Sequence, residues 1–151
     1  MKKLFYLFLM MPMALLMSCK DDKIADVDMT LTLDGVTFVD NNFYTVAGNE
    51  VTIESLEVDP VGGKSTSLAN VQYFLSGAPI IGMPGEEGLS FSTEDLEAGT
   101  YNINVTGNLL QVDSSIQIFA ANYSLTIVES DDDLPAGAPE IGTYSQTLRV
   151  N

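Results

Sequence analysis

Apolar and polar residues alternate along this chain in one segment after another between Val27 and Val128. Successive side chains of a β-strand point to opposite faces, so a period of two indicates strands with one buried and one solvated face. The alternation is clearest over residues 27–33, 101–106 and 123–127. Only residues 93–98 have the pattern of a single helical turn, and they lead directly into a strand. The chain is therefore predicted to be all-β.

Turn signals separate these strands. Asp34-Gly35 is a pair that accepts positive φ and predicts a turn, after which a strand resumes over 36–39. Gly48-Asn49 predicts another turn, and the apolar positions that follow it change phase, which predicts a β-bulge near Ser55. Strands that recur every ~8 to 15 residues with glycine-rich turns between them favour a β-sandwich.

Residues 96–101 carry a more specific pattern. Leu96, Gly99 and Tyr101 precede an alternating strand, and their spacing resembles the tyrosine corner of immunoglobulin-like and fibronectin type III domains. The resemblance implies one immunoglobulin-like β-sandwich over residues 27–130, in which Leu96 fills the core, Gly99 turns the chain and the Tyr101 hydroxyl bonds backbone across the corner. The chain has one cysteine and no tryptophan, so it resembles the branch of these domains without a disulfide. The alternative is an ordinary edge tyrosine after a glycine turn.

The first 18 residues have the parts of a secretory signal peptide. Two lysines precede an apolar run over residues 4–17, which is shorter than the ~20 residues that a spanning helix needs. Leu16-Met17-Ser18-Cys19 resembles the bacterial lipobox, although Met17 is larger than the residues usual there. The resemblance implies cleavage after Ser18 and a covalent lipid such as palmitate on Cys19. The alternative is an inert cysteine at the end of an ordinary signal segment.

The three residues after Cys19 indicate where in the cell the protein is expected. Lys20, Asp21 and Asp22 resemble the surface-export signal of Bacteroidota lipoproteins. The resemblance implies a lipid anchor in the outer membrane with the domain exposed at the cell surface, reached through a flexible tether over residues 19–26. The alternatives are a charged spacer and a periplasmic location. Two or more acyl chains on one protein give stable anchoring, whereas one gives marginal binding.

The charge of the expected mature chain excludes one class of partner. Removing residues 1–18 leaves 133 of the 151 residues and takes two of the six basic ones, so four basic residues face 21 acidic ones and the net charge is −17. Nucleic-acid binding needs clustered Lys and Arg, which this surface lacks. No cysteine would then remain to form a disulfide, so the hydrophobic core must hold the fold.

Residue types also restrict the chemistry. The chain has no histidine, and its only cysteine is expected to carry lipid. Ser-His-Asp and Cys-His catalysis, histidine-ligated zinc and thiol redox chemistry are therefore excluded. Carboxylate pairs are plentiful, so residue type alone does not exclude a glycosidase-like acid/base pair. Glu86-Glu87 lies in a glycine-flanked loop and Glu94-Asp95-Glu97 on a turn, however, where they are expected to be solvated and to lack the cleft that a catalytic carboxylate needs. We expect no enzymatic activity and no cofactor apart from the lipid.

Residues 131–151 form an acidic and Pro/Gly-rich linker with a weak strand signal over 143–150. That segment is expected either to add an edge strand to the domain or to pair with another chain. Asp131, Asp132 and Asp133 are candidate calcium ligands if they approach Asp26 and Asp28, because calcium takes clustered carboxylate oxygens. The competing interpretation is a solvated acidic tail.

These observations favour a non-catalytic surface protein that serves as an adhesion, scaffold or accessory binding module for a protein or glycan ligand. Its contacts are expected on loops far from the lipid, over 60–68 and 82–88. One alternative is a carbohydrate-binding component of a polysaccharide uptake system that uses Phe43-Tyr44 or Tyr123, each beside an asparagine. The other is a fimbria-like assembly subunit that pairs through residues 143–150.

Overall fold

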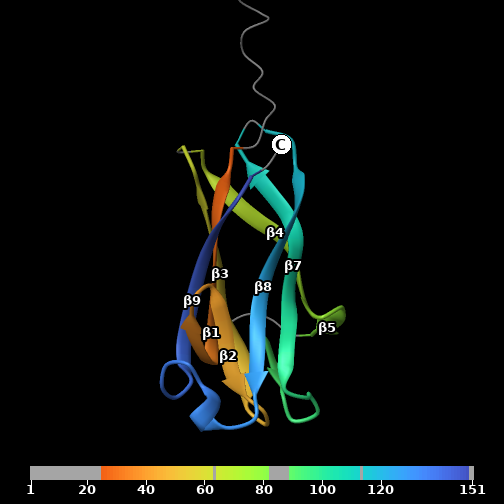
Figure 1. The fold of residues 1–151 in the computed structure, drawn as a ribbon. Helices are drawn as coiled ribbons and strands as arrows, with labels where there is room; N and C mark the ends of the chain where they lie inside the picture. The colour runs from red at the N-terminus through yellow and green to blue at the C-terminus, as the bar shows by residue number, and fades with distance from the viewer. Residues whose placement is uncertain (1–24, 63, 82–88, 113, 150–151) are drawn as a thin grey trace, which may run out of the picture.

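The computed structural model describes residues 25–149 except 63, 82–88 and 113, and these described residues are mostly strand (Figure 1). They contain no α-helix, so the all-β prediction is confirmed. A short 3-10 turn, η1 (Asp131–Asp133), precedes the last strand. The strands are β1 (Val27–Val39), β2 (Asn42–Val46), β3 (Glu50–Pro60), β4 (Thr66–Leu75), β5 (Ala78–Ile80), β6 (Leu89–Ser92), β7 (Gly99–Gln111), β8 (Gln117–Val128) and β9 (Glu140–Leu148).

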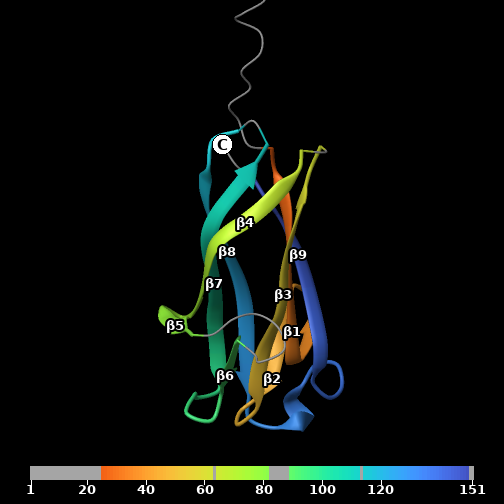
Figure 2. The ribbon, with the colours of Figure 1, turned by 180° about the vertical axis from the view of Figure 1, so that it is seen from behind.

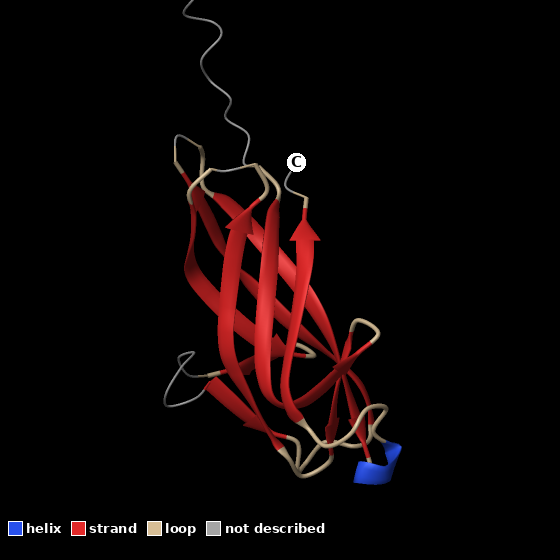
Figure 3. Cartoon of the chain, turned by 90° about the vertical axis from the view of Figure 1, so that its left-hand side faces the viewer, coloured by secondary structure: helices blue, strands red, loops and turns tan. Residues whose placement is uncertain are grey.

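The strands pair in two groups that share β1. One group has the order β9-β1-β3-β6, and the other has the order β5-β4-β7-β8-β2. Figures 1 and 2 show β9, β1 and β3 of the first group on one side of the molecule and β4, β7 and β8 on the other. All pairs are antiparallel except β2 and β8, which are parallel. The longer strands run along one long axis, and many of the loops that join them lie near its two ends (Figure 3).

Strand β1 changes partners at Gly35. Its pairing with β3 ends at Asp34 and its pairing with β9 ends at Val36, whereas 37–39 pair with β2. Gly35 has φ of 81°, and a Cβ there would overlap the carbonyl oxygen of Glu50, so only glycine fits. The turn expected at Asp34-Gly35 is thus a bend inside a long strand. The tight turn follows at Asp40-Asn41, where both residues have positive φ, as a two-residue hairpin of type I′ requires.

The bulge expected near Ser55 is confirmed. Thr32 of β1 pairs with Ser55 of β3, and the next residue of β1, Leu33, pairs with Ile53. Glu54 is therefore the extra residue on β3. The insertion explains the change of phase, because it moves the apolar positions of β3 from odd to even numbers.

The core lies between the two groups of strands. Its members include Met29, Leu31, Leu33 and Ile53 from the first group and Ile103, Leu109, Tyr123 and Leu125 from the second. One hydrogen bond crosses it directly, from the Tyr123 hydroxyl to the carbonyl oxygen of Met29 at 3.3 Å. On one side of the core, the ring of Tyr144 of β9 packs against the rings of Phe38, Phe43 and Tyr123.

The C-terminal segment is part of this fold. Strand β9 pairs with β1 from Val36↔Glu140 to Val27↔Leu148, and side-chain hydrogen bonds join Thr30 to Ser145 and Thr32 to Thr143. Of the two expectations for residues 143–150, the structure shows pairing within the chain. The folded region therefore continues past residue 130, where the sequence predicted a linker, to Leu148.

Candidate functional site

The residues expected to carry the anchor, Cys19 with Lys20, Asp21 and Asp22, lie outside the described residues. Ala25 is the first residue that the structure describes, and the buried side-chain amide of Gln111 holds it in place. The Gln111 side chain accepts a hydrogen bond from the Ala25 N–H at 2.8 Å and donates to the Ala25 carbonyl at 3.3 Å. It also donates to Thr66 Oγ1 at 3.0 Å. We call these contacts the Gln111 clamp.

The clamp lies at one end of the molecule, which we call the N-terminal pole and define by Ala25, Val61, Val112, Ile116 and Arg149. The Val61 N–H donates to the Asp26 carbonyl at 2.8 Å, because the last residue of β3 pairs with the first of β1. The expectation that loop 60–68 lies far from the tether is therefore wrong for its first residues. The other expected contact loop, 82–88, lies outside the described residues.

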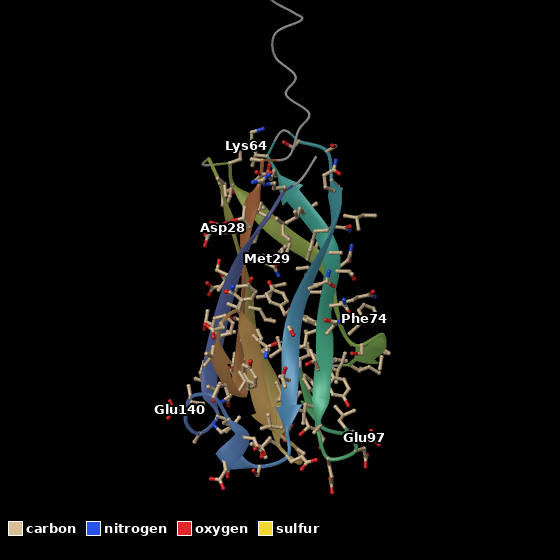
Figure 4. The ribbon with its side chains drawn as sticks, viewed as in Figure 1. Asp28, Met29, Lys64, Phe74, Glu97 and Glu140 are labelled. Carbon is tan, nitrogen blue, oxygen red and sulfur yellow. The ribbon has the colours of Figure 1, made fainter. Side chains whose placement is uncertain are left out.

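The opposite pole consists of loops 47–49, 93–98 and 129–139. Backbone hydrogen bonds tie the first loop to its neighbours, from Thr93 N to Asn49 O and from Ala47 N to Val128 O, both at 2.9 Å. Figure 4 shows Glu97 and Glu140 toward this end and Lys64 at the other. The long axis of the strands separates the two poles.

The residues of the expected tyrosine corner lie at the opposite pole. The Tyr101 hydroxyl donates to the carbonyl oxygen of Glu97 at 2.8 Å, which is a bond to backbone a few residues upstream. Tyr101 begins the alternating part of β7 and pairs with Leu125 of β8. Leu96 is only half-buried and lies outside the core, so the expectation that it fills the core is wrong. Its backbone N–H donates to the carbonyl oxygen of Thr93 at 3.1 Å.

The candidate calcium ligands do not come together. Asp131, Asp132 and Asp133 form η1 and are exposed, and the Asp133 carboxylate accepts a hydrogen bond from Ser130. Asp28 lies near the other end of β1 and accepts from Thr147. Asp131–Asp133 precede β9, which begins beside Val36, and eight residue steps along β1 separate Val36 from Asp28, about 26 Å at ~3.3 Å per residue. Among the described residues, no group of three or more metal-binding side chains gathers.

Two of the aromatic residues expected to contact a glycan are in the core. Phe43 has no exposed surface and Tyr123 has 1%, so neither reaches a ligand. Burial raises the pKa of Tyr123, and the neighbouring Tyr144 adds to the rise, while a hydrogen bond with Gln146 opposes it. Tyr44 is half-buried on β2. Of the asparagines beside these rings, Asn41 lies in the turn before β2 and Asn42 begins β2, whereas Asn122 is exposed on β8.

A row of outward-facing side chains was not singled out from the sequence. Pro79 of β5, Phe74 of β4, Asn104 of β7 and Asn122 of β8 are successive cross-strand partners on one face. Asn104 donates to the side-chain oxygen of Asn122. Phe74 is half-buried, while its neighbour Tyr73 points into the core, and Figure 4 shows Phe74 at the outer side of these strands. Ile103 and Val105 on either side of Asn104 are buried, and this alternation in the sequence was the signal that Asn104 faces outward.

This row has a shallow groove beside it. The groove is lined by Phe74 and Gln72 of β4 and by Pro79, Ile80 and Ile81 of the β5 segment. An aromatic ring beside amide side chains and a groove can stack on one face of a flat ligand while the amides exchange hydrogen bonds with it. The row thus combines an aromatic ring, two side-chain amides and a groove on one described face.

In the part of the chain that the structure describes, no helix is long and apolar enough to cross a membrane. No protein-family model matches the chain, and no curated protein sequence matches it either.

Proposed function

We propose that this chain is a non-catalytic, lipid-anchored surface protein whose immunoglobulin-like domain serves as an adhesion, scaffold or accessory binding module. The observation that supports it best is the Gln111 clamp. The clamp holds Ala25, near the end of the expected tether, at the N-terminal pole. The long axis of the domain then separates the anchor from the loops of the opposite pole. An anchor on Cys19 in the outer membrane would then hold those loops away from the bilayer.

The strand order supports an immunoglobulin-like sandwich. Strands β1, β3 and β6 have the neighbours of strands A, B and E of such domains, and β4, β7 and β8 have those of C, F and G. The Tyr101–Glu97 bond lies at the start of β7, the equivalent of strand F, where the tyrosine corner occurs. In this assignment β9 is an additional strand on the edge of β1.

The opposite pole is the proposed contact surface. Its loops carry Glu94, Asp95 and Glu97 together with the three aspartates of η1, all of them exposed. Such a concentration of negative charge complements a basic protein partner and speeds its association at low ionic strength. These loops replace 60–68 as the segments that we expect to bind.

Anchoring and display are tested in the bacterium with the full-length chain. A palmitate analogue should label the wild-type protein and not Cys19→Ser. Protease added to intact cells should digest the labelled protein, whereas replacement of Lys20, Asp21 and Asp22 by alanine should protect it without loss of label. Equal labelling of wild type and Cys19→Ser would contradict the anchor, and protection of the wild-type protein would contradict surface display.

Carbohydrate binding is the second candidate, and the Phe74 row favours it. The ring would stack on a sugar while Asn104 and Asn122 exchange hydrogen bonds with its hydroxyls. A glycan array of the mature chain should then give hits that Phe74→Ala abolishes. Tyr44→Ala removes a half-buried ring elsewhere on the surface and is the matched control. An array without hits, or hits that survive Phe74→Ala, would contradict this candidate.

A further inference from the structure

The N-terminal pole exposes aliphatic side chains. Val61 is 47% exposed, Val112 is 61% exposed and Ile116 is 65% exposed. They come from two neighbouring connections, β3–β4 and β7–β8, which a hydrogen bond from the Val112 N–H to the Ser65 carbonyl joins at 3.3 Å. The strands beneath them are held by the Gln111 clamp. The exposed side chains therefore extend from a well-fixed base.

The two basic residues of the described chain lie at the same pole. Lys64 and Arg149 are the only lysine and arginine among the described residues. Lys64 lies in the β3–β4 connection, and Arg149 follows Leu148, which pairs with Val27 at the start of β1. The acidic loops lie at the opposite pole. Asp26, Asp28 and Asp59, however, lie at the N-terminal pole, at the start of β1 and the end of β3, so this pole is of mixed charge. The opposite pole carries Glu94, Asp95, Glu97 and Asp131–Asp133 with no lysine or arginine among its described residues, so it is the more acidic of the two.

The expected tether brings this pole to the bilayer. Six residue steps separate Cys19 from Ala25, so even a fully extended tether reaches only about 20 Å at ~3.3–3.6 Å per residue. Ala25 cannot drift from the pole, because Gln111 bonds both its N–H and its carbonyl. A lipid on Cys19 therefore keeps Val61, Val112 and Ile116 within reach of the membrane that holds the anchor.

We propose that the N-terminal pole is a membrane-docking surface, on which Val61, Val112 and Ile116 enter the headgroup boundary of the bilayer. Aliphatic side chains lose their contact with water there, and Lys64 and Arg149 face the lipid phosphates. The acidic opposite pole is repelled by the same anionic headgroups, so the charge distribution favours one orientation. The domain then stands upright. This inference rests on the proposed anchoring at Cys19.

The test uses the mature chain from Cys19, which contains every described element. Its only thiol is coupled either to a maleimide lipid in phosphatidylcholine vesicles that contain phosphatidylglycerol or to a soluble maleimide polymer. Amide hydrogen exchange is then compared between the two forms. We expect exchange in the β3–β4 and β7–β8 connections to slow several-fold on vesicles, while loops 93–98 and 129–139 keep their rates.

Variants identify the side chains responsible. A triple variant should abolish the slowing of amide exchange on vesicles; it combines Val61→Asp, Val112→Asp and Ile116→Asp. Ile141→Asp is the matched control, because Ile141 is 66% exposed and lies at the start of β9, far from the N-terminal pole. Equal exchange in the vesicle and polymer forms would overturn the docking surface. The same slowing in concentrated protein without vesicles would identify a second copy as the occupant and would also overturn it.

The coupling is chemical, so this result does not depend on lipidation in the cell. A lack of palmitate labelling in the bacterium refutes the anchor and leaves the exchange result intact. Unchanged exchange on vesicles refutes the docking surface and leaves the anchor intact.

Discussion

Replacement of Gln111 by alanine removes the clamp at the N-terminal pole. Gln111 is 6% exposed and makes three hydrogen bonds, two with the backbone of Ala25 and one with Thr66. A hydrogen bond contributes about 1 kcal/mol to stability, and the groups left behind regain water in part because this end of the domain is near solvent. We therefore expect Gln111→Ala to lower the free energy of unfolding by about 2–3 kcal/mol.

The assay is urea unfolding of residues 19–151, together with thermal melting. A loss of this size corresponds to a fall in Tm of about 6–10 °C for a domain of this length. Gln117→Ala is the control, because Gln117 makes one long hydrogen bond, of 3.3 Å, to the exposed Ser115. It should change Tm by about 1 °C or less. Equal losses for the two variants would refute the reasoning, since the clamp would then contribute no more than an ordinary surface amide.

Three further outcomes follow from described contacts. Tyr101→Phe removes the hydroxyl that bonds Glu97 and should cost about 1 kcal/mol in urea unfolding, and an unchanged urea midpoint would count against the corner. Gly35→Ala should cost more than Gly48→Ala, since both have positive φ but only the Gly35 position is closed by a backbone carbonyl; equal costs would contradict this. Burial, aided by the charge of Tyr123, raises the pKa of Tyr73 to about 12 from 10.0, so the unfolded chain loses this proton first. The protonated Tyr73 hydroxyl therefore contributes its full stabilisation below pH 10, and this stabilisation is lost as the pH rises toward 12. Tyr73→Phe should flatten the fall of the urea midpoint between these pH values. An identical fall in both proteins would contradict the raised pKa.

The local structure follows from the sequence where a single strand determines its own pattern. Ile103 and Val105 alternate with polar residues because each strand has one core-facing side, and this alternation locates β7 well. The bulge at Glu54 also follows from the sequence, since an inserted residue must reverse the phase of the apolar positions. In these places the information is local, and the structure agrees with it.

Pairing between distant strands could not be predicted in the same way. Nothing local to residues 140–148 specifies β1 as the partner of β9, and the Pro/Gly-rich stretch before them reads as the end of the domain. The Gln111 clamp was missed for the same reason, because a polar residue at the end of a strand has no sequence signal for a bond to Ala25. The burial of Phe43 and Tyr123 depends on Tyr144, which only the β9 pairing brings to them.

The pairing of β9 with β1 makes the first strand depend on the last. Asp28 and Thr147, which share a hydrogen bond, are 119 residues apart in the chain. Contacts between residues so distant in sequence slow folding, because a long loop must close before they form. During synthesis the N-terminal end emerges first, and one edge of β1 then stays without its partner until the C-terminal residues have followed. A chain that loses residues after 139 would keep that edge open permanently and present a template for aggregation.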